Sequence, residues 1–341
     1  MKIIIDDKIP YIRESVAALG ADAVYKKGSE IGPADVRDAD ALIVRTRTRC
    51  DEALLGGSSV SFVATATIGF DHIDAGYMRR AGIEWMSCPG CNASSVAQYV
   101  RSVLLLMRYR LGAALGGMTL GIVGCGHVGT KVAAAARGLG MRILVCDPPR
   151  QERGEGDGFV SLDTVARECD VITFHVPLTK DGPHPTYHLA GRGFFDSLVR
   201  RPVVINTSRG AVADNGALLD AIIYNKVSRA VVDTWENEPL ISRALLGRVW
   251  IGTPHIAGYS ADGKVNADNM VIDGLCRHFG LRRPPLIVPP ALPADFTPEA
   301  DIDDPCLRLY NPEKDSAALK AAPGRFEELR GNYRLRREHR S

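Results

Sequence analysis

The stretch of this sequence that most constrains its fold is residues 118–149, MTLGIVGCGHVGTKVAAAARGLGMRILVCDPP. Residues 119–123 form a short apolar run, which is typical of a strand buried on both faces. An alanine-rich segment with helical spacing of its apolar residues follows, and Gly140 stands where a helix commonly ends on a left-handed residue. A second apolar run, residues 142–146, ends in Asp147. The stretch therefore predicts a strand, a helix and a second strand in succession.

The glycines after the first of these strands are spaced as in a dinucleotide-binding loop. Gly124 allows the tight turn that leaves the strand, Gly126 lets the backbone approach a pyrophosphate, and Gly129 lets the helix pack against the strand. The free N–H groups at the start of the helix favour phosphate. Asp147 stands where an acid can bind a ribose 2′-hydroxyl and repel the 2′-phosphate of NADP. A glycine-rich turn in another α/β protein is the alternative, but strand, helix and acid together favour NAD as the cofactor.

Strands and helices alternate along the rest of the chain, whose 341 residues suffice for two or three domains. Besides those of the glycine loop, short apolar runs predict strands at residues 2–6, 23–25, 41–46, 61–67, 83–87, 171–175, 203–206, 229–233 and 250–252. This alternation indicates parallel sheets with helices on both faces. A long helix is expected at residues 94–111, and a domain boundary near it. The later part differs: helices are expected at residues 313–321 and 325–337, the latter strongly charged and with a solvated face.

Composition and charge describe an ordinary globular protein. Hydrophobic residues make up 45% of the chain, charged residues 24%, and the net charge is +2, which gives no case for binding nucleic acid or a membrane. Acidic residues directly follow the apolar N-terminal run, unlike in a signal peptide, so we expect a cytoplasmic protein with eight reduced cysteines. Cys88 and Cys91 form a CxxC pair, but a zinc or redox role needs a second half-site or a thioredoxin-like context. No metal site is expected.

Three polar residues follow predicted strands of the dinucleotide-binding half: Arg209, Glu238 and His255. Because ligands of open α/β sheets bind beyond the carboxyl ends of the strands, these residues would face the nicotinamide end of the cofactor. An arginine can bind a carboxylate through two hydrogen bonds, and a histidine can transfer a proton near neutral pH. A lone histidine after a strand is more often structural, but the three together suit the oxidation of a 2-hydroxy acid.

The motifs around these residues, GIVGCGHVG, NTSRGAVAD, DTWENEP and TPHIAGYS, resemble those of the D-isomer-specific 2-hydroxyacid dehydrogenases. Two further motifs, PGCNA and PGRFEELRGNYRLRRE, are similar to a branch of that family that acts in pyridoxal 5′-phosphate (vitamin B6) biosynthesis. The resemblance implies NAD-dependent oxidation of 4-phospho-D-erythronate to 2-oxo-3-hydroxy-4-phosphobutanoate. Two alternatives stay open. One is a sibling activity on 3-phosphoglycerate or on glyoxylate and hydroxypyruvate, and the other is a non-catalytic NAD(H)-sensing partner protein.

The resemblance also implies a role for each of the three polar residues. Arg209 would bind the substrate carboxylate and polarise the oxygen at C2. His255 would take the proton of the C2 hydroxyl as hydride leaves C2, while Glu238 would orient His255 and stabilise the imidazolium that forms. The residues implied to contact the cofactor are Gly124, Gly126, Gly129, Asp147, Val176, Thr207, Ser208, Arg209, Asp233 and Gly258.

Substrate contacts are implied at Thr46, Thr67 and Tyr259. The 4-phosphate needs cations or N–H donors, and Arg45 is the residue we expect to bind it, with a structural ion pair as the alternative. Arg49 would share a face with Arg45 if the strand continued that far.

The domain organisation implied by the resemblance has three parts. A flavodoxin-like, doubly wound parallel-sheet domain of residues 1–95 with 256–280 would bind the substrate, and a doubly wound NAD-binding domain would span residues 96–255. A small α+β dimerisation region would occupy residues 281–341 and make the protein a homodimer.

Overall fold

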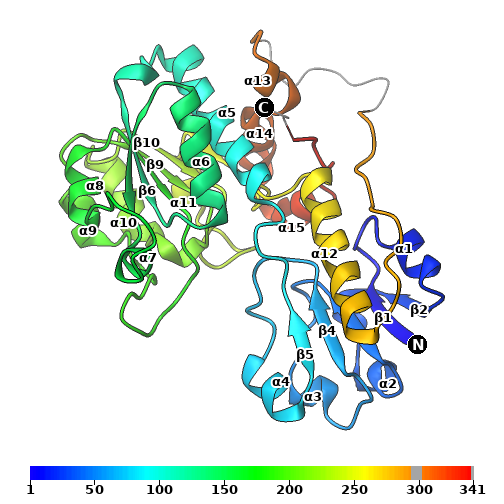
Figure 1. Ribbon diagram of the computed structural model, residues 1–341. Helices are drawn as coiled ribbons and strands as arrows, with labels where there is room; N and C mark the ends of the chain where they lie inside the picture. Colours follow the sequence, from blue (N-terminus) through cyan, green and yellow to red (C-terminus); the bar gives the residue numbers. More distant parts are fainter. Residues whose placement is uncertain (293–301, 339–341) are drawn as a thin grey trace. The chain divides into compact units, whose positions relative to one another are not determined.

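The computed structural model describes residues 1–292 and 302–338, which divide into two compact units (Figure 1). Unit 1 comprises Met1–Asn92 and Ser260–Leu292, and unit 2 comprises Ala93–Tyr259 and Pro293–Ser341. The residues after 280, expected as a separate region, divide between the two units. The roles expected of the three parts stay predictions.

Unit 1 is built on a parallel sheet whose strand order is β2-β1-β3-β4-β5. Its strands are β1 (Lys2–Asp6), β2 (Asp22–Lys26), β3 (Ala41–Val44), β4 (Phe62–Thr65) and β5 (Glu84–Met86). The expected strands are confirmed, with ends that shift by at most two residues. Every residue of β3 and β4 is buried, as expected for central strands that are covered on both faces.

Helices cover both faces of this sheet. They are α1 (Arg13–Ala18), α2 (Pro33–Val36), α3 (Glu52–Leu55), α4 (Ala75–Ala81) and α12 (Ala261–Phe279). The helix α12, which follows the last strand of unit 2 in the chain, packs on the sheet through Gly274, where an added Cβ would lie 2.2 Å from Met86 Sδ and 3.0 Å from Phe62. Val271 and Leu275 of the same helix join the core of unit 1.

Unit 2 contains a second parallel sheet with the strand order β11-β10-β9-β8-β6-β7. Its strands are β6 (Thr119–Val123), β7 (Arg142–Cys146), β8 (Val171–Phe174), β9 (Val203–Asn206), β10 (Arg229–Val232) and β11 (Ile251–Gly252). The chain leaves β6 for β7 on one side and returns to β8 on the other. The point between β6 and β8 is therefore the topological switch point, where ligands of doubly wound sheets bind.

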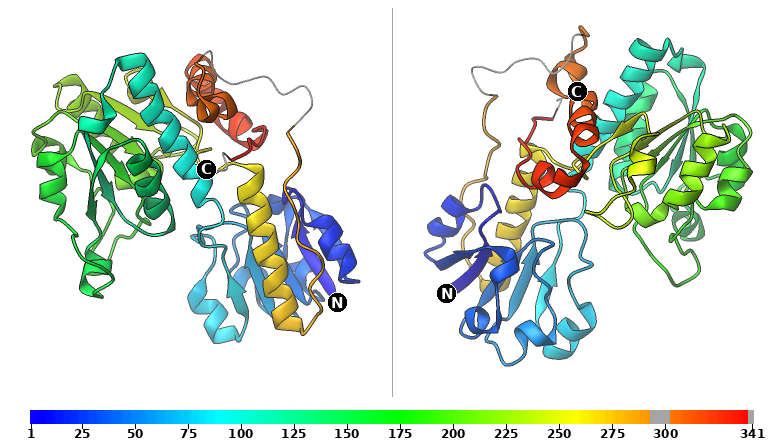
Figure 2. Two further views of the ribbon diagram at one scale, coloured as in Figure 1. Left: turned by 45° about the horizontal axis from the view of Figure 1, so that its top comes forward. Right: turned by 180° about the vertical axis from the view of Figure 1, so that it is seen from behind.

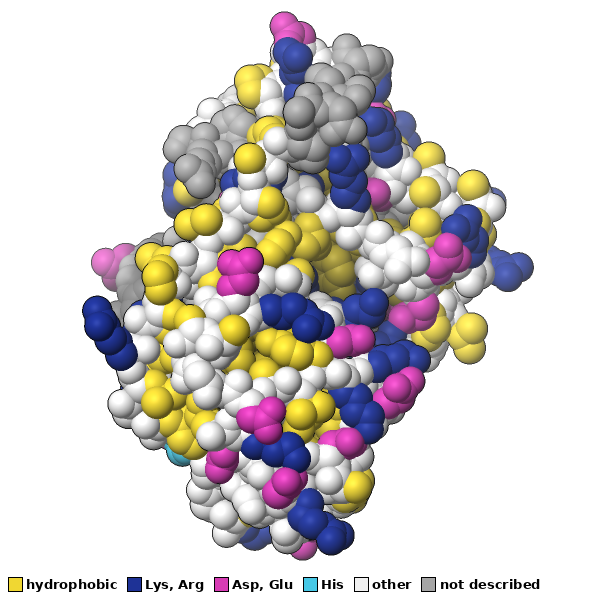
Figure 3. Space-filling model, turned by 90° about the vertical axis from the view of Figure 1, so that its right-hand side faces the viewer, with side chains coloured by type: hydrophobic (Ala, Val, Ile, Leu, Met, Phe, Trp, Pro, Cys, Tyr) yellow, Lys and Arg dark blue, Asp and Glu magenta, His cyan; other side chains and the backbone are white. Residues whose placement is uncertain are grey.

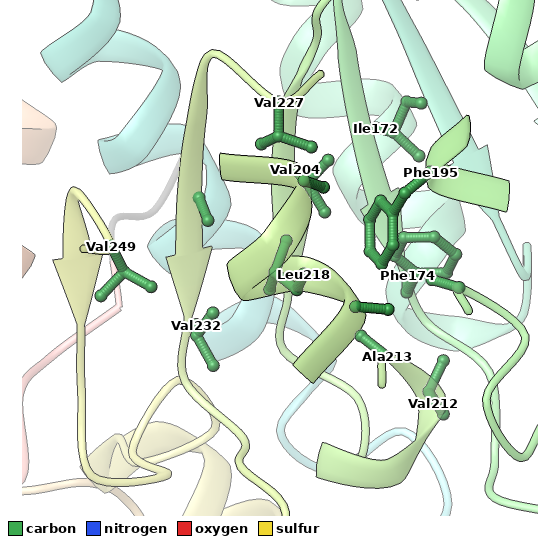
Figure 4. Close-up of a cluster of buried hydrophobic side chains, with 14 of the residues drawn as sticks. Ile172, Phe174, Phe195, Val204, Val212, Ala213, Leu218, Val227, Val232 and Val249 are labelled. Atoms are coloured by element: carbon green, nitrogen blue, oxygen red, sulfur yellow. The ribbon is translucent and has the colours of Figure 1, made fainter. Parts of the chain in front are cut away.

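Successive residues of these strands contact opposite layers of helices. Ile172, Phe174, Val204 and Val232 point to one face and pack with Leu218 and other residues of that layer (Figure 4). Alternate residues of the strands point to the other face, onto the pair of helices α5 and α6.

The helices that pack around this sheet are α5 (Ala93–Leu111), α6 (His127–Gly138), α7 (Pro148–Glu152), α8 (Leu162–Glu168), α9 (Arg192–Asp196), α10 (Asn215–Ile223) and α11 (Arg243–Leu246). Short 3-10 turns are η1 (Gly28–Glu30), η2 (Leu115–Gly117), η3 (Gly210–Val212) and η4 (Pro323–Arg325).

The C-terminal helices of unit 2 are α13 (Pro305–Leu309), α14 (Pro312–Ala321) and α15 (Phe326–Gly331). Helices α13 and α14 lie beside α5, as both views of Figure 2 show. Helix α14 also covers the edge of the sheet, because Ser316 Oγ accepts a hydrogen bond from Gly252 N (3.0 Å) and Lys320 Nζ donates to Trp250 O (3.0 Å). These side chains satisfy backbone groups that an edge strand otherwise exposes.

The charged segment 325–337 differs from the expectation in two ways. Its helix ends at Gly331, and Arg336 is only 7% exposed, so the segment does not simply present a solvated face. The physical reason is that the Arg336 guanidinium finds backbone carbonyl acceptors inside unit 2, which compensate for its removal from water.

The surface shown in Figure 3 carries Lys and Arg side chains interspersed with Asp and Glu side chains. This mixing agrees with the small net charge of +2. Among the helices of the described residues, none is long and apolar enough to cross a membrane.

Candidate active site

The glycine loop between β6 and α6 has the shape of a phosphate cradle. Gly124 has a φ of +88°, a conformation that favours glycine, and an added Cβ at Gly129 would lie 2.1 Å from Gly124 O. An added Cβ at Gly126 would meet nothing within 4 Å, so this side of the loop is open. Gly126 is the N-cap of α6, so no N-cap side chain occupies the N–H groups at the start of this helix. The N–H groups at the start of α6 are thus available to an anion.

Asp147 connects the end of β7 to the glycine loop. Its Oδ2 accepts from Cys125 N (2.7 Å), and its Oδ1 accepts from Arg150 N (3.1 Å) at the start of α7. A carboxylate beside an open glycine cradle is the arrangement that a ribose next to a pyrophosphate requires. The residues present in unit 2 therefore fit a dinucleotide.

His255 and Glu238 form a hydrogen-bonded pair, here called the His–Glu pair. His255 Nδ1 lies 2.8 Å from Glu238 Oε2, and Glu238 Oε1 accepts from Trp235 N (2.9 Å). Because an ionised carboxylate only accepts hydrogen bonds, His255 Nδ1 carries the hydrogen of this bond. Burial opposes ionisation of Glu238, but the hydrogen bond and charge of His255, with the Trp235 N–H and the charge of Arg330, lower the pKa of Glu238 below its ordinary value.

Asp233 fixes the backbone that follows His255 through hydrogen bonds. This residue is 1% exposed, and its Oδ1 accepts from Ile256 N (2.8 Å) and from Thr253 Oγ1 (2.6 Å), while its Oδ2 accepts from Ala257 N (2.9 Å). Burial raises the pKa of Asp233, although these donors and the charge of His255 act in the opposite direction. His255 itself has a φ of +58°, which is uncommon for a residue with a side chain and typical of functional sites.

Arg209 follows β9 in a loop that lies directly against the loop containing Glu238. Contact between the two backbones depends on Gly210, where an added Cβ would lie 1.9 Å from Trp235 O. Asn206 fixes the same turn by accepting from Ser208 N (3.1 Å) and donating to Arg209 O (3.0 Å). Sequence reasoning did not assign Gly210 and Asn206 a role, although both belong to the motif NTSRG.

A half-buried histidine that sequence reasoning also missed lies beside the expected nicotinamide contacts. His175 Nε2 lies 3.0 Å from Thr173 Oγ1, and its Nδ1 lies 3.4 Å from Thr207 Oγ1. Burial lowers the pKa of His175 to about 3, so the ring is neutral and can orient the Thr207 hydroxyl. Val176, next in the chain, lies against the glycine loop, with its Cγ1 2.7 Å from where a Gly124 Cβ would be.

The other expected cofactor residues also lie in unit 2, Ser208 in a buried position and Gly258 in the loop after His255. Tyr259, expected to contact the substrate, lies in the same loop, and its ring packs edge-on against Tyr333 with centroids 6.1 Å apart. The residues expected to act in catalysis and in cofactor binding therefore all lie within one compact unit.

The other expected substrate residues belong to unit 1. Thr46 follows β3 and is exposed; Thr67 follows the neighbouring strand β4, and its hydroxyl lies 2.7 Å from Thr65 Oγ1. Arg45 Nε pairs with the buried Asp6 carboxylate at 3.3 Å, which is the structural ion pair considered as the alternative to phosphate binding.

The condition for Arg45 and Arg49 to share a strand face is not met, because β3 ends at Val44 before either residue, and Arg49 pairs locally with Asp51 (2.7 Å). The polar residues that follow Val44 turn away from the strand direction and form a loop instead.

The cysteines of the CxxC pair are both buried. Cys88 Sγ donates to Thr65 O (3.4 Å) and to Ala267 O (3.5 Å), and burial raises the pKa of this thiol far above its ordinary value. Such a thiol is a poor nucleophile and metal ligand because the reactive form is the thiolate. Within residues 1–292 and 302–338, no group of three or more His, Cys, Asp or Glu residues could hold a metal ion.

Comparison with known proteins agrees with this geometry. The family model for the D-isomer specific 2-hydroxyacid dehydrogenase, NAD binding domain, matches residues 94–257, which lie within unit 2. The chain is 53% identical to the erythronate-4-phosphate dehydrogenase of Bacteroides fragilis (strain YCH46) over 338 residues, 99% of this chain and 97% of that protein. It is 41% identical to the erythronate-4-phosphate dehydrogenase of Escherichia coli O17:K52:H18 over 350 residues, 99% of this chain and 92% of that protein.

Solved structures show the same fold. The NAD⁺-bound 3-phosphoglycerate dehydrogenase of Entamoeba histolytica aligns with a TM-score of 0.69 and 27% identity, over 82% of this chain and 95% of that chain. The D-lactate dehydrogenase of Aquifex aeolicus, complexed with NAD and lactic acid, aligns with a TM-score of 0.68 and 24% identity, over 82% and 96%. With its glycine cradle, its His–Glu pair and full-length relatives of one name, the chain belongs to the erythronate-4-phosphate dehydrogenases, NAD-dependent oxidoreductases of the D-isomer specific 2-hydroxyacid dehydrogenase family.

Proposed function

We propose that the protein oxidises 4-phospho-D-erythronate to 2-oxo-3-hydroxy-4-phosphobutanoate with NAD as oxidant, as a step of pyridoxal 5′-phosphate biosynthesis. The observation that most supports the proposed oxidation is the His–Glu pair, in which His255 Nδ1 lies 2.8 Å from Glu238 Oε2. The pair lies in the unit that matches the NAD-binding family model. The substrate is inferred from the name of the relatives, which align with nearly the whole chain.

His255 is proposed as the base. In its neutral form Nε2 takes the proton of the C2 hydroxyl, so the C2–O bond becomes a carbonyl while the C2 hydrogen leaves with its electron pair. NAD, when bound, supplies the acceptor for that hydride. Glu238 keeps the ring in the required tautomer and stabilises the imidazolium that results. Because the base must start neutral, oxidation is expected to accelerate as the pH rises and the imidazolium loses its proton.

Arg209 is proposed to bind the substrate carboxylate through its guanidinium and to polarise the C2 oxygen. The proposed cofactor-binding residues are those named from the resemblance: Gly124, Gly126, Gly129, Asp147, Val176, Thr207, Ser208, Arg209, Asp233 and Gly258. The open side of the glycine loop and the position of Asp147 support the assignment of the phosphate and ribose ends.

Thr46, Thr67 and Tyr259 are proposed as further substrate contacts, and Arg45 as the ligand of the 4-phosphate. Under this proposal the ion pair with Asp6 fixes the position of the Arg45 guanidinium. Exchange of Arg45 for Met tests the assignment, since it is expected to raise KM for the phosphorylated substrate more than it lowers kcat. An unchanged KM would show that Arg45 serves only the ion pair.

A homodimer and a cytoplasmic location are also proposed, as in the sequence analysis. Sedimentation velocity of the purified protein tests the assembly: a species of about twice the chain mass of 36.9 kDa supports it, and a monomer overturns it.

The function is tested by NADH formation at 340 nm with 4-phospho-D-erythronate and, in parallel, with 3-phosphoglycerate and glycerate, with no added 2-oxo acid, which would reoxidise the NADH being measured. Strong preference for the four-carbon phosphate supports the proposal, and turnover of 3-phosphoglycerate or glycerate alone would reassign the protein to a sibling activity. Arg209→Ala separates an enzyme from an NAD(H) sensor. An enzyme loses nearly all turnover while NADH still binds, whereas partner binding by a sensor would survive this change.

A further inference from the structure

Two arginines of the C-terminal segment, residues 326–338, converge on the loop that carries His255. They are Arg330 on α15 and Arg336 beyond it, and both belong to unit 2 together with the His–Glu pair. Neither is among the residues assigned to substrate or cofactor. Their side chains are largely buried, which is costly for a guanidinium unless it finds acceptors or anions.

Arg330 faces the carboxylate of the His–Glu pair. Its Nη1 lies 3.8 Å from Glu238 Oε2, the oxygen that also accepts from His255 Nδ1. The Arg330 side chain is 19% exposed, and a hydrogen bond links it to the side chain of Tyr259. The helix that carries it is anchored by Phe326, which is 1% exposed and part of the main core of unit 2. This cation is therefore fixed close to the pair.

Arg336 fastens the same segment to the backbone after His255. Its Nη1 donates to Ile256 O (3.0 Å) and Tyr259 O (2.9 Å), and its Nη2 donates to Ala257 O (2.5 Å). The guanidinium carbon also lies 3.9 Å from the centre of the Tyr310 ring. The loop is thus held between Asp233 on one side and Arg336 on the other.

The charges that face the His–Glu pair come from several elements. Asp233 at the end of β10 acts on His255, Arg330 acts on Glu238 from α15, and Glu327 lies 3.9 Å from Arg330 Nη1. The phenol of Tyr259 also contacts Arg330. Arg330 is an arginine that the structure records beside Glu238. Its charge favours the carboxylate and opposes the positive charge that His255 gains on protonation.

We propose that Arg330 is a positioning residue for the acid–base step: its cation keeps Glu238 ionised and limits how strongly Glu238 holds the imidazolium of His255, while Arg336 fixes the loop that carries His255. The inference rests on the proposed roles of Glu238 and His255. It makes the C-terminal segment part of the catalytic machinery of its own chain.

The consequence is a defined change in pH dependence. Without the cation, Glu238 attracts the imidazolium more strongly, so His255 stays protonated to higher pH and fewer molecules carry the neutral base. We expect Arg330→Met to move the acidic limb of kcat/KM for oxidation upward by about half to one pH unit. Arg330→Lys keeps the charge and is expected to keep the profile within about 0.2 unit of wild type. A merely structural arginine would lower activity at every pH without moving the limb.

The control is Arg325→Met, which removes an exposed arginine directly before that segment, one that pairs with Glu328 (2.5 Å). Its pH profile is expected to match wild type. A profile of Arg330→Met that superimposes on wild type would overturn the proposal, and so would an equal shift in Arg330→Lys. If Arg330→Met does not fold, as judged by circular dichroism and NADH binding, Arg330→Gln replaces it with the same expectations.

A second measurement needs no turnover and keeps this inference separate from the proposed function. The ring signals of ¹³C-labelled histidine are titrated by NMR in the full-length protein, and the signal of His255 is identified by its loss in His255→Asn. An upward move of its midpoint in Arg330→Met supports the proposal even if 4-phospho-D-erythronate is not the substrate. An unchanged midpoint overturns it even if the enzyme is active.

Discussion

Arg336 offers the sharpest test of the packing argument, because its guanidinium is the donor for several carbonyls at once. Arg336→Met keeps most of the aliphatic stem and removes every donor. The carbonyls of Ile256, Ala257, Tyr259 and Ser95 then lose this partner in a region where Arg336 itself is only 7% exposed.

The magnitude follows from these contacts. A buried polar group left without a partner costs about 1–3 kcal/mol, and some of the four carbonyls will be reached by water. The variant also avoids the cost of burying a charge, which offsets part of the loss. We therefore expect unit 2 to lose about 3–5 kcal/mol of unfolding free energy, because several carbonyls at about 1–3 kcal/mol each outweigh that offset.

The assay is equilibrium unfolding in urea, followed by the fluorescence of Trp235 and Trp250 in unit 2 and by circular dichroism. Since the chain has two compact units, the transition of unit 2 is identified as the one that NADH moves to higher urea. With a slope of about 2–3 kcal/mol per molar urea, its midpoint is expected to fall by about 1–2 M. Arg334→Met, at an exposed arginine of the same segment, is the control. A loss below about 1 kcal/mol in Arg336→Met would refute the reasoning.

Three further predictions concern single positions. Gly129→Ala should destabilise unit 2 by about 1–3 kcal/mol, because its Cβ would lie 2.1 Å from Gly124 O. Gly126→Ala should leave stability unchanged and weaken NADH binding, since its Cβ would meet only the space proposed for the phosphates. Equal effects of the two variants in urea unfolding and in NADH titration would contradict this reasoning. Asp147→Asn should lower the ratio of kcat/KM for NAD over NADP at least about 10-fold, and an unchanged ratio would contradict the role of its charge. Burial raises the pKa of Asp268 to about 7, so the folded state holds this proton more tightly than the unfolded state and stability falls as the pH rises from about 4 to about 7. Asp268→Asn should abolish that fall and stabilise unit 1 above pH 7 by up to about 4 kcal/mol in urea titrations, and an unaltered pH dependence would rule out Asp268 as its source.

Most of the fold could be predicted from the sequence because its elements are marked locally. An apolar run bounded by turn residues predicts a strand wherever the strand is buried on both faces, and the runs of both sheets confirm this. The short helix α3 was not expected. Its N-cap Asp51 accepts from Leu54 N (3.2 Å), but the helix has four residues and too little periodicity to stand out.

The candidate site could also be predicted only in part from the sequence. The glycine spacing, Asp147 and the three polar strand ends could be found because the carboxyl ends of parallel strands lie at one edge of a sheet. The sequence could not show that His175 lies beside Thr207, or that Gly210 lets two loops touch. Both contacts join segments that are far apart in the chain, and neither residue type by itself indicates a partner.

By itself, the sequence determined the α/β class and the position of the dinucleotide loop, and it indicated candidate catalytic residues. Strand burial, helix periodicity and glycine spacing are properties of contiguous residues. Only the tertiary structure decided what the charged C-terminal segment does. Taken alone, RFEELRGNYRLRRE is typical of a solvated helix, because arginine is ordinarily exposed. The fold instead brings carbonyls and the Glu238 carboxylate to this segment, and these long-range contacts make the burial of Arg336 and Arg330 favourable.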